Sequence, residues 1–147
     1  MEQVKPITIL LVEDDLGHAR LVEKNLRRAN IMNEIILFGN GQELIDFLFH
    51  SVEYEPSALK ERLLILLDLN MPVMDGYEAL RRIKAYEPTK YIPVIILTTT
   101  YDTAEIARCY ELGCNVYITK PVDYEQFSEV INRLGLFLSI VAIPKGA

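Results

Sequence analysis

Short apolar runs alternate along the chain with longer segments in which apolar residues recur every three or four positions. The first, third and fourth runs lack polar alternation, a pattern typical of strands buried on both faces of a parallel sheet. The longer segments have the spacing of amphipathic helices that cover such a sheet. We expect five strands, at residues 7–12, 34–38, 63–67, 94–97 and 116–118.

Helices are expected between and after these strands, at residues 16–29, 41–49, 76–85, 103–112 and from Tyr124 onward. Four of the helix starts have a side-chain acceptor followed three residues later by Glu or Gln, the pattern of a capping box. These pairs are Asn40 with Glu43, Asp75 with Glu78, Asp102 with Glu105, and Asp123 with Gln126. Five strand-then-helix units predict right-handed crossovers and one doubly wound α/β domain.

One segment does not fit this alternation. Residues 50–62, HSVEYEPSALKER, form a stretch longer than the connections that such folds usually need. We interpret it as a loop, either a solvated insertion or a surface for a specific partner.

Charge and composition exclude several classes of function. The net charge is −6, with 21 acidic and 15 basic residues, whereas a nucleic-acid partner requires a basic face. Cys109 and Cys114 make neither a disulfide framework nor, without further ligands at suitable spacing, a zinc site. The longest apolar run, residues 134–144, is shorter than the roughly 18 residues of a membrane span. We therefore expect a cytoplasmic protein that binds neither nucleic acid nor membrane.

In an open parallel sheet, the functional crevice lies beyond the carboxyl ends of the strands, so functional residues are expected directly after the apolar runs. Polar residues stand at these positions. The residues at these positions are Glu13 and Asp14, Asp68 and Asn70, Thr98 and Thr99, and Lys120. Three carboxylates in one small site repel one another unless a cation joins them, and hard oxygen ligands favour Mg²⁺. With metal and ammonium neutralising the incoming charge, Asp68 becomes a candidate nucleophile toward phosphorus.

Four ordered motifs carry a family resemblance: ILLVEDD (residues 9–15), LLDLNMPVMDG (66–76), IILTT (95–99) and YITKP (117–121). Together they resemble a response-regulator receiver domain, and the resemblance extends from Ile7 to about Leu134. It implies a flavodoxin-like (βα)5 fold with a parallel five-stranded sheet in the order 2-1-3-4-5 and helices on both faces. Residues 1–134 would form the receiver domain.

The resemblance also implies roles for the residues of the site. Asp68 would accept a phosphoryl group from a histidine kinase, with self-catalysed transfer and slow autodephosphorylation as the only catalysis. Asp14, Asp68 and the backbone carbonyl of Asn70 would hold Mg²⁺, with Glu13 reaching the ion directly or through water. Thr98 and the Thr99 amide would contact the phosphoryl group, and the ammonium of Lys120 would pair with one of its oxygens. Thr98 and Tyr117 would form the conformational switch.

Other features narrow the subfamily and the output. Thr99 stands where many receivers have alanine, and this difference affects dephosphorylation, so the sequence predicts no lifetime for the phosphoryl group. The 50–62 segment and the ending LGLFLSIVAIP resemble phytochrome-associated single-domain regulators. Only 24 residues follow Asp123, so we expect output through protein contacts or phosphotransfer rather than a DNA-binding module. Apolar residues on all sides of residues 136–143 suggest that residues 135–147 form a homodimer arm, with a tail folded on its own core as the alternative.

Two other functions are compatible with parts of the sequence. The sequence Asp68-Leu-Asn70 resembles the nucleophile motif of haloacid-dehalogenase-type phosphohydrolases, but Asn70 cannot act as their proton donor. A receiver used only for docking, never phosphorylated, is the second alternative. Asp15 is interpreted as the cap of the first helix, and His18 and His50 are assigned no role.

Overall fold

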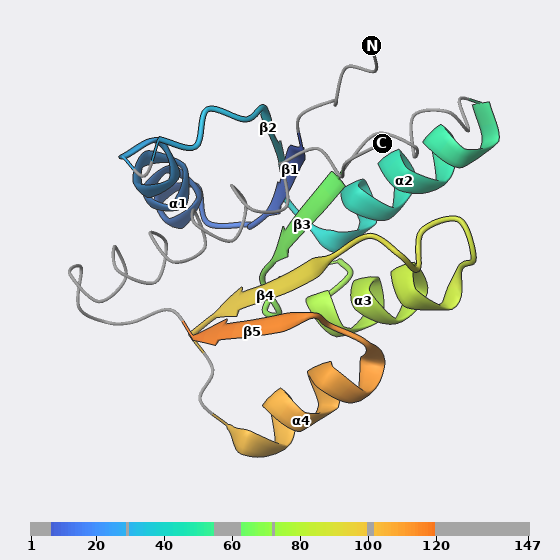
Figure 1. Cartoon of the computed structure of the whole chain (residues 1–147). Helices are drawn as coiled ribbons and strands as arrows, with labels where there is room; N and C mark the ends of the chain where they lie inside the picture. Colours follow the sequence, from blue (N-terminus) through green and yellow to red (C-terminus); the bar gives the residue numbers. More distant parts are fainter. Residues whose placement is uncertain (1–6, 29, 55–62, 72, 100–101, 120–147) are drawn as a thin grey trace, which may run out of the picture.

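A parallel five-stranded sheet runs through the protein, with the strands in the order β2-β1-β3-β4-β5 (Figure 1). The computed structural model describes residues 7–28, 30–54, 63–71, 73–99 and 102–119. The strands are β1 (Thr8–Val12), β2 (Ile35–Phe38), β3 (Leu63–Leu67), β4 (Val94–Thr98) and β5 (Val116–Thr119). This confirms the doubly wound flavodoxin-like fold and its strand order, and the strand boundaries differ from the predicted ones by one residue at most.

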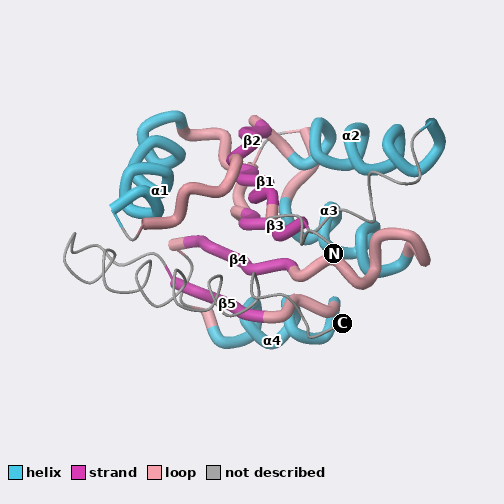
Figure 2. The backbone as a smooth tube through the Cα atoms, turned by 45° about the horizontal axis from the view of Figure 1, so that its top comes forward, coloured by secondary structure: helices cyan, strands magenta, loops and turns pink. Residues whose placement is uncertain are grey.

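The central strands β1, β3 and β4 are buried on both faces, because their side chains alternate between two apolar clusters. Along β1, Leu10 and Val12 belong to an apolar cluster with α2 (Gly41–Tyr54), α3 (Gly76–Ala85) and α4 (Thr103–Leu112). Ile9 and Leu11 belong to a second cluster, which includes the buried side of α1 (Leu16–Arg28). The helices therefore cover opposite faces of one sheet (Figure 2).

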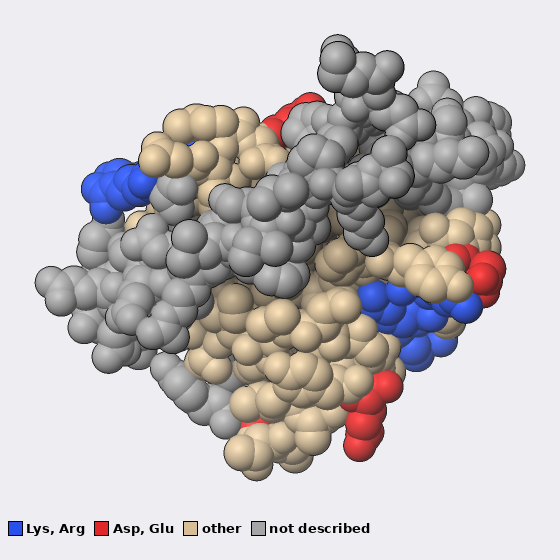
Figure 3. Space-filling view, in the orientation of Figure 1, with Lys and Arg blue, Asp and Glu red and all other residues tan. Residues whose placement is uncertain are grey.

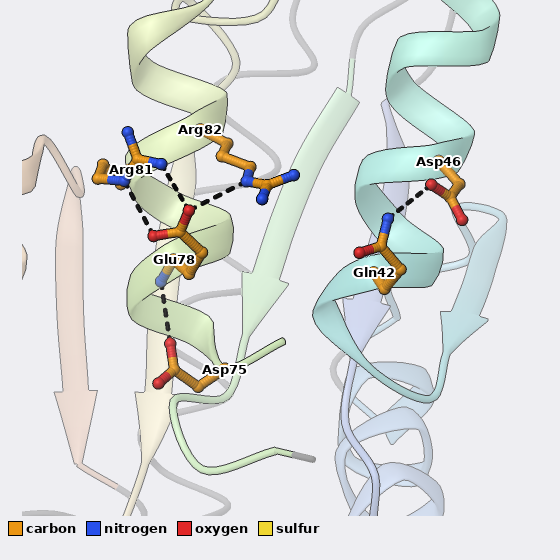
Figure 4. A network of polar contacts seen from close by, with 6 residues as sticks. All are labelled: Gln42, Asp46, Asp75, Glu78, Arg81 and Arg82. Atoms are coloured by element: carbon orange, nitrogen blue, oxygen red, sulfur yellow. Dashed lines mark hydrogen bonds and ion pairs between the residues drawn. The ribbon is translucent and has the colours of Figure 1, made fainter. Parts of the chain in front are cut away.

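Each described helix starts at a side-chain cap. In all four, Oδ1 of the residue before the helix accepts a backbone N–H from the first turn. The N–H of His18 donates to Asp15 (3.1 Å), and that of Glu43 donates to Asn40 (2.9 Å). The N–H of Glu78 donates to Asp75 (3.0 Å), and that of Ala104 donates to Asp102 (2.9 Å). A capping box also has a second hydrogen bond, from the backbone N–H of the cap residue to the Glu side chain, and at α3 this bond differs from the prediction. There the carboxylate of Glu78 accepts from Arg81 and Arg82 on the next turn instead of from the cap (Figure 4).

The end of α2 corrects a prediction. We expected this helix to end at Phe49, but it continues to Tyr54, so residues 50–54 are helical rather than part of a loop. The helix continues past the buried Leu48 because the sequence offers no glycine or proline before Pro56 to stop it. Residues 55–62 lie outside the described part of the chain.

The two cysteines have a structural role at the end of α4. Gly113 adopts a left-handed φ of 104° and donates its N–H to the Tyr110 carbonyl (3.0 Å). Cys114 donates to the Cys109 carbonyl (3.0 Å), which completes a Schellman motif whose apolar pair is the two buried thiols. Burial raises the pKa of Cys109 to about 11. Both cysteines thus pack as small apolar side chains.

Several predictions fall outside the described residues: the helix from Tyr124, the domain boundary at residue 134 and the apolar arm of residues 135–147. Within the described chain, no helix is both long and apolar enough to cross a membrane. On the face seen in Figure 3, the visible described Lys and Arg side chains gather in two separate places, over α1 and near the end of α3. They form no continuous basic strip on that face.

Candidate functional site

The candidate site begins where β1 and β3 end side by side. Val12 of β1 lies in register with Leu67 of β3. The chain continues in sheet-like pairing for one more residue on each strand, because Asp68 donates its N–H to the Val12 carbonyl (3.1 Å) and Glu13 donates to the Phe38 carbonyl (3.0 Å). The acidic residues that follow the two strands are therefore held at the same edge of the sheet.

Glu13, Asp14 and Asp68 form one acidic cluster at this edge. Each contributes a carboxylate oxygen, and these three atoms lie within 4.8 Å of one another. Glu13 and Asp68 are buried, with 3% and 8% of their surface exposed, whereas Asp14 is exposed. Like charges this close repel, so a bound cation would stabilise the arrangement. An all-oxygen donor set fits a hard divalent ion such as Mg²⁺ or Mn²⁺.

The loop after β3 holds the backbone of Asp68. Asp68 Oδ1 accepts the N–H of Leu69 (2.8 Å), and the Leu69 carbonyl accepts the N–H of Gly76 (2.9 Å), the first residue of α3. A side chain at Gly76 would collide with the Asp68 carbonyl and come within 2.7 Å of Leu69 Cα. Only glycine allows α3 to start this close to the end of β3.

Backbone strain occurs in the same loop. Val73 has a φ of 70°, in the left-handed region that β-branched residues avoid, and its side chain is 82% exposed. Asn70, whose backbone carbonyl we expected at the metal, is exposed in this loop. Strain of this kind concentrates at functional sites, and here it lies five residues after Asp68.

Thr98 ends β4 at the same edge of the sheet. Its side chain is fully buried, and its Oγ1 has no hydrogen-bond partner within the described chain. A buried hydroxyl without a hydrogen-bond partner destabilises the folded protein, so a ligand that hydrogen-bonds to it would bind favourably. Thr99 is exposed, and Lys120 lies outside the described residues.

Tyr117, the expected switch residue, lies on the neighbouring strand. It is in register with Ile96 of β4, and its ring packs on the same apolar cluster as Ile96, so Tyr117 and Thr98 share one face of the sheet. Its N–H donates to the hydroxyl of Tyr110 (3.1 Å). Burial, with smaller contributions from Cys109 and Glu105, raises the pKa of Tyr117 to about 12.

One neighbour of the acidic cluster was missed at the level of sequence. His18 was assigned no role because no acidic partner stood at a recognised spacing, but its Nδ1 lies 3.7 Å from Glu13 Oε1. The sequence feature that could have revealed this contact is the position of His18 in the first turn of a helix that starts directly after the acidic end of β1. A side chain there can turn back toward the carboxyl end of the preceding strand.

The family comparison agrees with this geometry. Residues 9–132 match the response regulator receiver domain, and the chain belongs to that family. Response regulator Rcp1 from Synechocystis is 38% identical over 144 residues, which cover 97% of each protein.

Solved structures of related proteins have the same fold. A receiver domain from Rhodospirillum rubrum is 52% identical, with a TM-score of 0.84 over 90% of this chain and 94% of that one. The Mn²⁺-bound form of Rcp1 is 36% identical, with a TM-score of 0.81 over 95% of this chain and all of the other. The phosphorylated cyanobacterial phytochrome response regulator RcpA is 33% identical, with a TM-score of 0.79 over 91% and 94%.

The protein is thus a receiver domain of two-component signalling, homologous to phytochrome response regulators. Membership of this class implies a histidine kinase as partner. The acidic cluster of Glu13, Asp14 and Asp68 is consistent with the phosphoacceptor and divalent-metal site of such a domain.

Proposed function

We propose that the protein is a single-domain response regulator in which Asp68 accepts a phosphoryl group from a histidine kinase. The observation that carries the proposal is the convergence of Glu13, Asp14 and Asp68 within 4.8 Å at the ends of adjacent strands. In the transfer, an Oδ atom of Asp68 forms a bond to phosphorus while the bond from phosphorus to the kinase histidine nitrogen breaks. The oxygen attacks as a carboxylate, so no proton has to leave Asp68.

Mg²⁺ is the proposed cofactor, since the donors at the site are oxygens. The carboxylates of Asp14 and Asp68 and the backbone carbonyl of Asn70 would hold it, with Glu13 reaching it directly or through water. Bound there, Mg²⁺ would neutralise charge on the phosphoryl oxygens. The Mn²⁺-bound structure of Rcp1 supports a divalent ion, and the buried carboxylates of Glu13 and Asp68 supply a reason for one.

Three further residues complete the proposed phosphoryl site. The hydroxyl of Thr98, buried without a partner among the described residues, would hydrogen-bond to a phosphoryl oxygen. The Thr99 amide would donate to another oxygen, and Lys120 would supply the positive charge. These bonds exist only in the phosphorylated state, so they shift the population toward a conformation in which Thr98 and Tyr117 move inward and the surface of α4 and β5 changes.

The upstream partner is proposed to be a phytochrome-type photoreceptor kinase. The similarity to Rcp1 and to RcpA, which is described as a phytochrome response regulator, supports this. Output would pass through protein contacts or further phosphotransfer. A homodimer formed through residues 135–147 stays a prediction, and light scattering tests it by comparing the full chain with a variant that ends at Leu134.

Intact-mass measurement after incubation with acetyl phosphate and Mg²⁺ tests the phosphoacceptor. The parent protein should gain one phosphoryl group and Asp68→Asn should gain none. Asp46→Asn is the matched control, since Asp46 is an exposed residue of α2 that accepts a hydrogen bond from Gln42 (2.7 Å), and it should label like the parent. A parent protein that takes no phosphoryl group would favour the docking module.

Phosphotransfer from a kinase tests the partner. An autophosphorylated phytochrome-type histidine kinase should transfer its phosphoryl group to the parent protein faster than an unrelated histidine kinase does. Equal rates would remove the phytochrome assignment and leave the receiver function intact.

A further inference from the structure

Tyr110 on α4 is bonded to the backbone of the proposed switch residue. Its hydroxyl accepts the N–H of Tyr117 on β5, with 3.1 Å between oxygen and nitrogen. Tyr117 lies in register with Ile96 of β4, but this N–H points away from β4, since its acceptor is a side chain of α4. In the described sheet β5 is an edge strand, so Tyr110 takes the hydrogen-bonding position that another strand would use.

The apolar packing of α4 on the sheet is slight. Within this helix only Cys109 is buried, whereas α1 and α3 each bury four residues. Tyr110 itself is 49% exposed. An element with few buried contacts changes its position at a low cost in free energy. The polar contacts between α4 and the sheet therefore carry a large share of its attachment.

The connection from α4 to β5 provides one attachment point. The N–H of Cys114 donates to the Cys109 carbonyl (3.0 Å), and the N–H of Asn115 donates to the Val94 carbonyl (2.9 Å). Oδ1 of Asn115 accepts the N–H of Val94 in return (2.9 Å). The end of α4 and the start of β5 are thus fixed to β4. The hydroxyl of Tyr110 is a second attachment point, and two points fix the rotation of a helix about its axis where one does not.

We propose that Tyr110 is a positioning residue that transmits the movement of Tyr117 to α4. When the ring of Tyr117 moves inward, any displacement of its backbone passes through the hydrogen bond to Tyr110 and rotates the weakly packed helix. This inference rests on the proposed function, in which phosphorylation of Asp68 moves Thr98 and Tyr117. It adds the contact through which that movement reaches the surface of α4.

Tyr110→Phe tests the role, because it removes the hydroxyl and keeps the ring. The full chain is phosphorylated in excess acetyl phosphate with Mg²⁺, and intact mass gives the phosphorylated fraction. Two-dimensional ¹H–¹⁵N NMR compares the α4 amide resonances before and after phosphorylation. In Tyr110→Phe these resonances should shift less than half as far as in the parent protein, at equal phosphoryl incorporation. Shifts as large as those of the parent protein would overturn the inference.

Tyr91→Phe is the matched control. It removes the same atom from a tyrosine that is 75% exposed and lies in the connection between α3 and β4. Its α4 resonances should respond to phosphorylation as those of the parent protein do. Equally reduced shifts in both variants would overturn the assignment to Tyr110, because the loss of any tyrosine hydroxyl would then explain the effect.

Amide hydrogen exchange in the unphosphorylated protein reads the bond directly. Loss of one hydrogen bond should speed the exchange of the Tyr117 amide about 2- to 10-fold in Tyr110→Phe. The amide of Ile96 on β4 should exchange at its parent rate, which separates a local effect from a general loss of stability. An unchanged rate at Tyr117 would mean that the hydroxyl does not hold this N–H in solution and would contradict the proposal.

The two proposals fail separately. A parent protein that takes up no phosphoryl group contradicts the proposed function. A parent protein that is phosphorylated without any change in its α4 amides contradicts the transmission to α4. A phosphorylated Tyr110→Phe variant with the full α4 response contradicts only the role of Tyr110.

Discussion

The guanidinium of Arg108 on α4 lies over the ring of Tyr77 on α3, with Cζ 4.2 Å from the ring centroid. Tyr77 contributes to the packing between the helices, and its hydroxyl is buried with no hydrogen-bond partner in the described chain. Burial and the nearby Glu105 carboxylate raise the pKa of Tyr77. Because α3 starts from the loop that follows Asp68, this contact joins α4 to an element anchored at the candidate site.

The Arg108–Tyr77 contact should have a measurable coupling energy. Arg108→Ala should lower the free energy of unfolding by about 0.5–1 kcal/mol, the usual value of a solvent-accessible cation–π contact. A double-mutant cycle with Tyr77→Leu, followed by urea unfolding, isolates the pairwise energy. Additive effects of the two substitutions would mean that the stacked geometry contributes nothing.

Gly76→Ala should damage both stability and the site. The new Cβ would collide with the Asp68 carbonyl and Leu69 Cα, backbone atoms that cannot yield as a flexible side chain does. We expect a loss of about 1–3 kcal/mol in urea unfolding, as for other overpacked positions. Titration calorimetry should show weaker Mg²⁺ binding, because the backbone of Asp68 has to move.

Gly39→Ala is the control for this substitution. Its Cβ would meet only the carboxylate of Glu43, at 3.6 Å, an ordinary contact. The variant should stay within about 0.5 kcal/mol of the parent protein, as surface substitutions usually do. Equal destabilisation by the two alanines would contradict the steric explanation.

Val73→Asn should stabilise the protein. The left-handed conformation at φ 70° costs a β-branched residue roughly 1–2 kcal/mol, and asparagine tolerates this region because its side chain can hydrogen-bond locally. The Val73 side chain is 82% exposed, so little packing is lost. Chemical denaturation should show a gain of about 1 kcal/mol. A variant no more stable than the parent protein would show that the backbone conformation carries no strain.

Asp14→Asn should have opposite effects with and without metal. Without metal, removal of one of three like charges should raise the free energy of unfolding by about 1 kcal/mol, the size of a Coulomb interaction near 4 Å in water. With excess Mg²⁺ the variant should gain less thermal stability than the parent protein, because weaker binding stabilises less. Melting temperatures in EDTA and in MgCl2 measure both effects, with Asp46→Asn as the control. An equal Mg²⁺-induced increase in Asp14→Asn would remove Asp14 from the metal site.

Glu78 should stabilise the protein at neutral pH and lose this contribution in acid. Hydrogen bonds from Arg81 and Arg82 lower the pKa of Glu78 from 4.5 to about 2 (Figure 4). A carboxyl group with a lowered pKa in the folded state stabilises the protein above its unfolded pKa, and this contribution is lost as the pH falls from about 4.5 toward 2. The difference in urea midpoint between the parent protein and Glu78→Gln should therefore shrink with decreasing pH.

The same difference should shrink in concentrated salt, because the group is exposed and its ion pairs are screened. A difference that stays constant from neutral to acidic pH would assign the effect of Glu78→Gln to helix propensity instead.

Local patterns were sufficient for most of the architecture. The bounds of β3, α3 and α4 match the prediction, since buried strands show as apolar runs and helix starts show as caps such as Asp75 and Asp102. The end of α2 was missed because residues 50–54 were interpreted as part of a loop, although none of them stops a helix.

The sequence by itself determined which segments become strands and helices, and which acids and hydroxyls follow the strands. The expected meeting of Glu13, Asp14 and Asp68 followed from the strand-end rule and the family motifs, whereas the tertiary structure alone decided the remaining contacts. Glu13 lies beside Asp68 because β1 pairs with β3, and His18 reaches Glu13 because packing sets the rotation of α1. Arg108 stacks on Tyr77 for the same kind of reason. Strand order and helix rotation result from the packing of the whole core, so no local pattern of residues contains them.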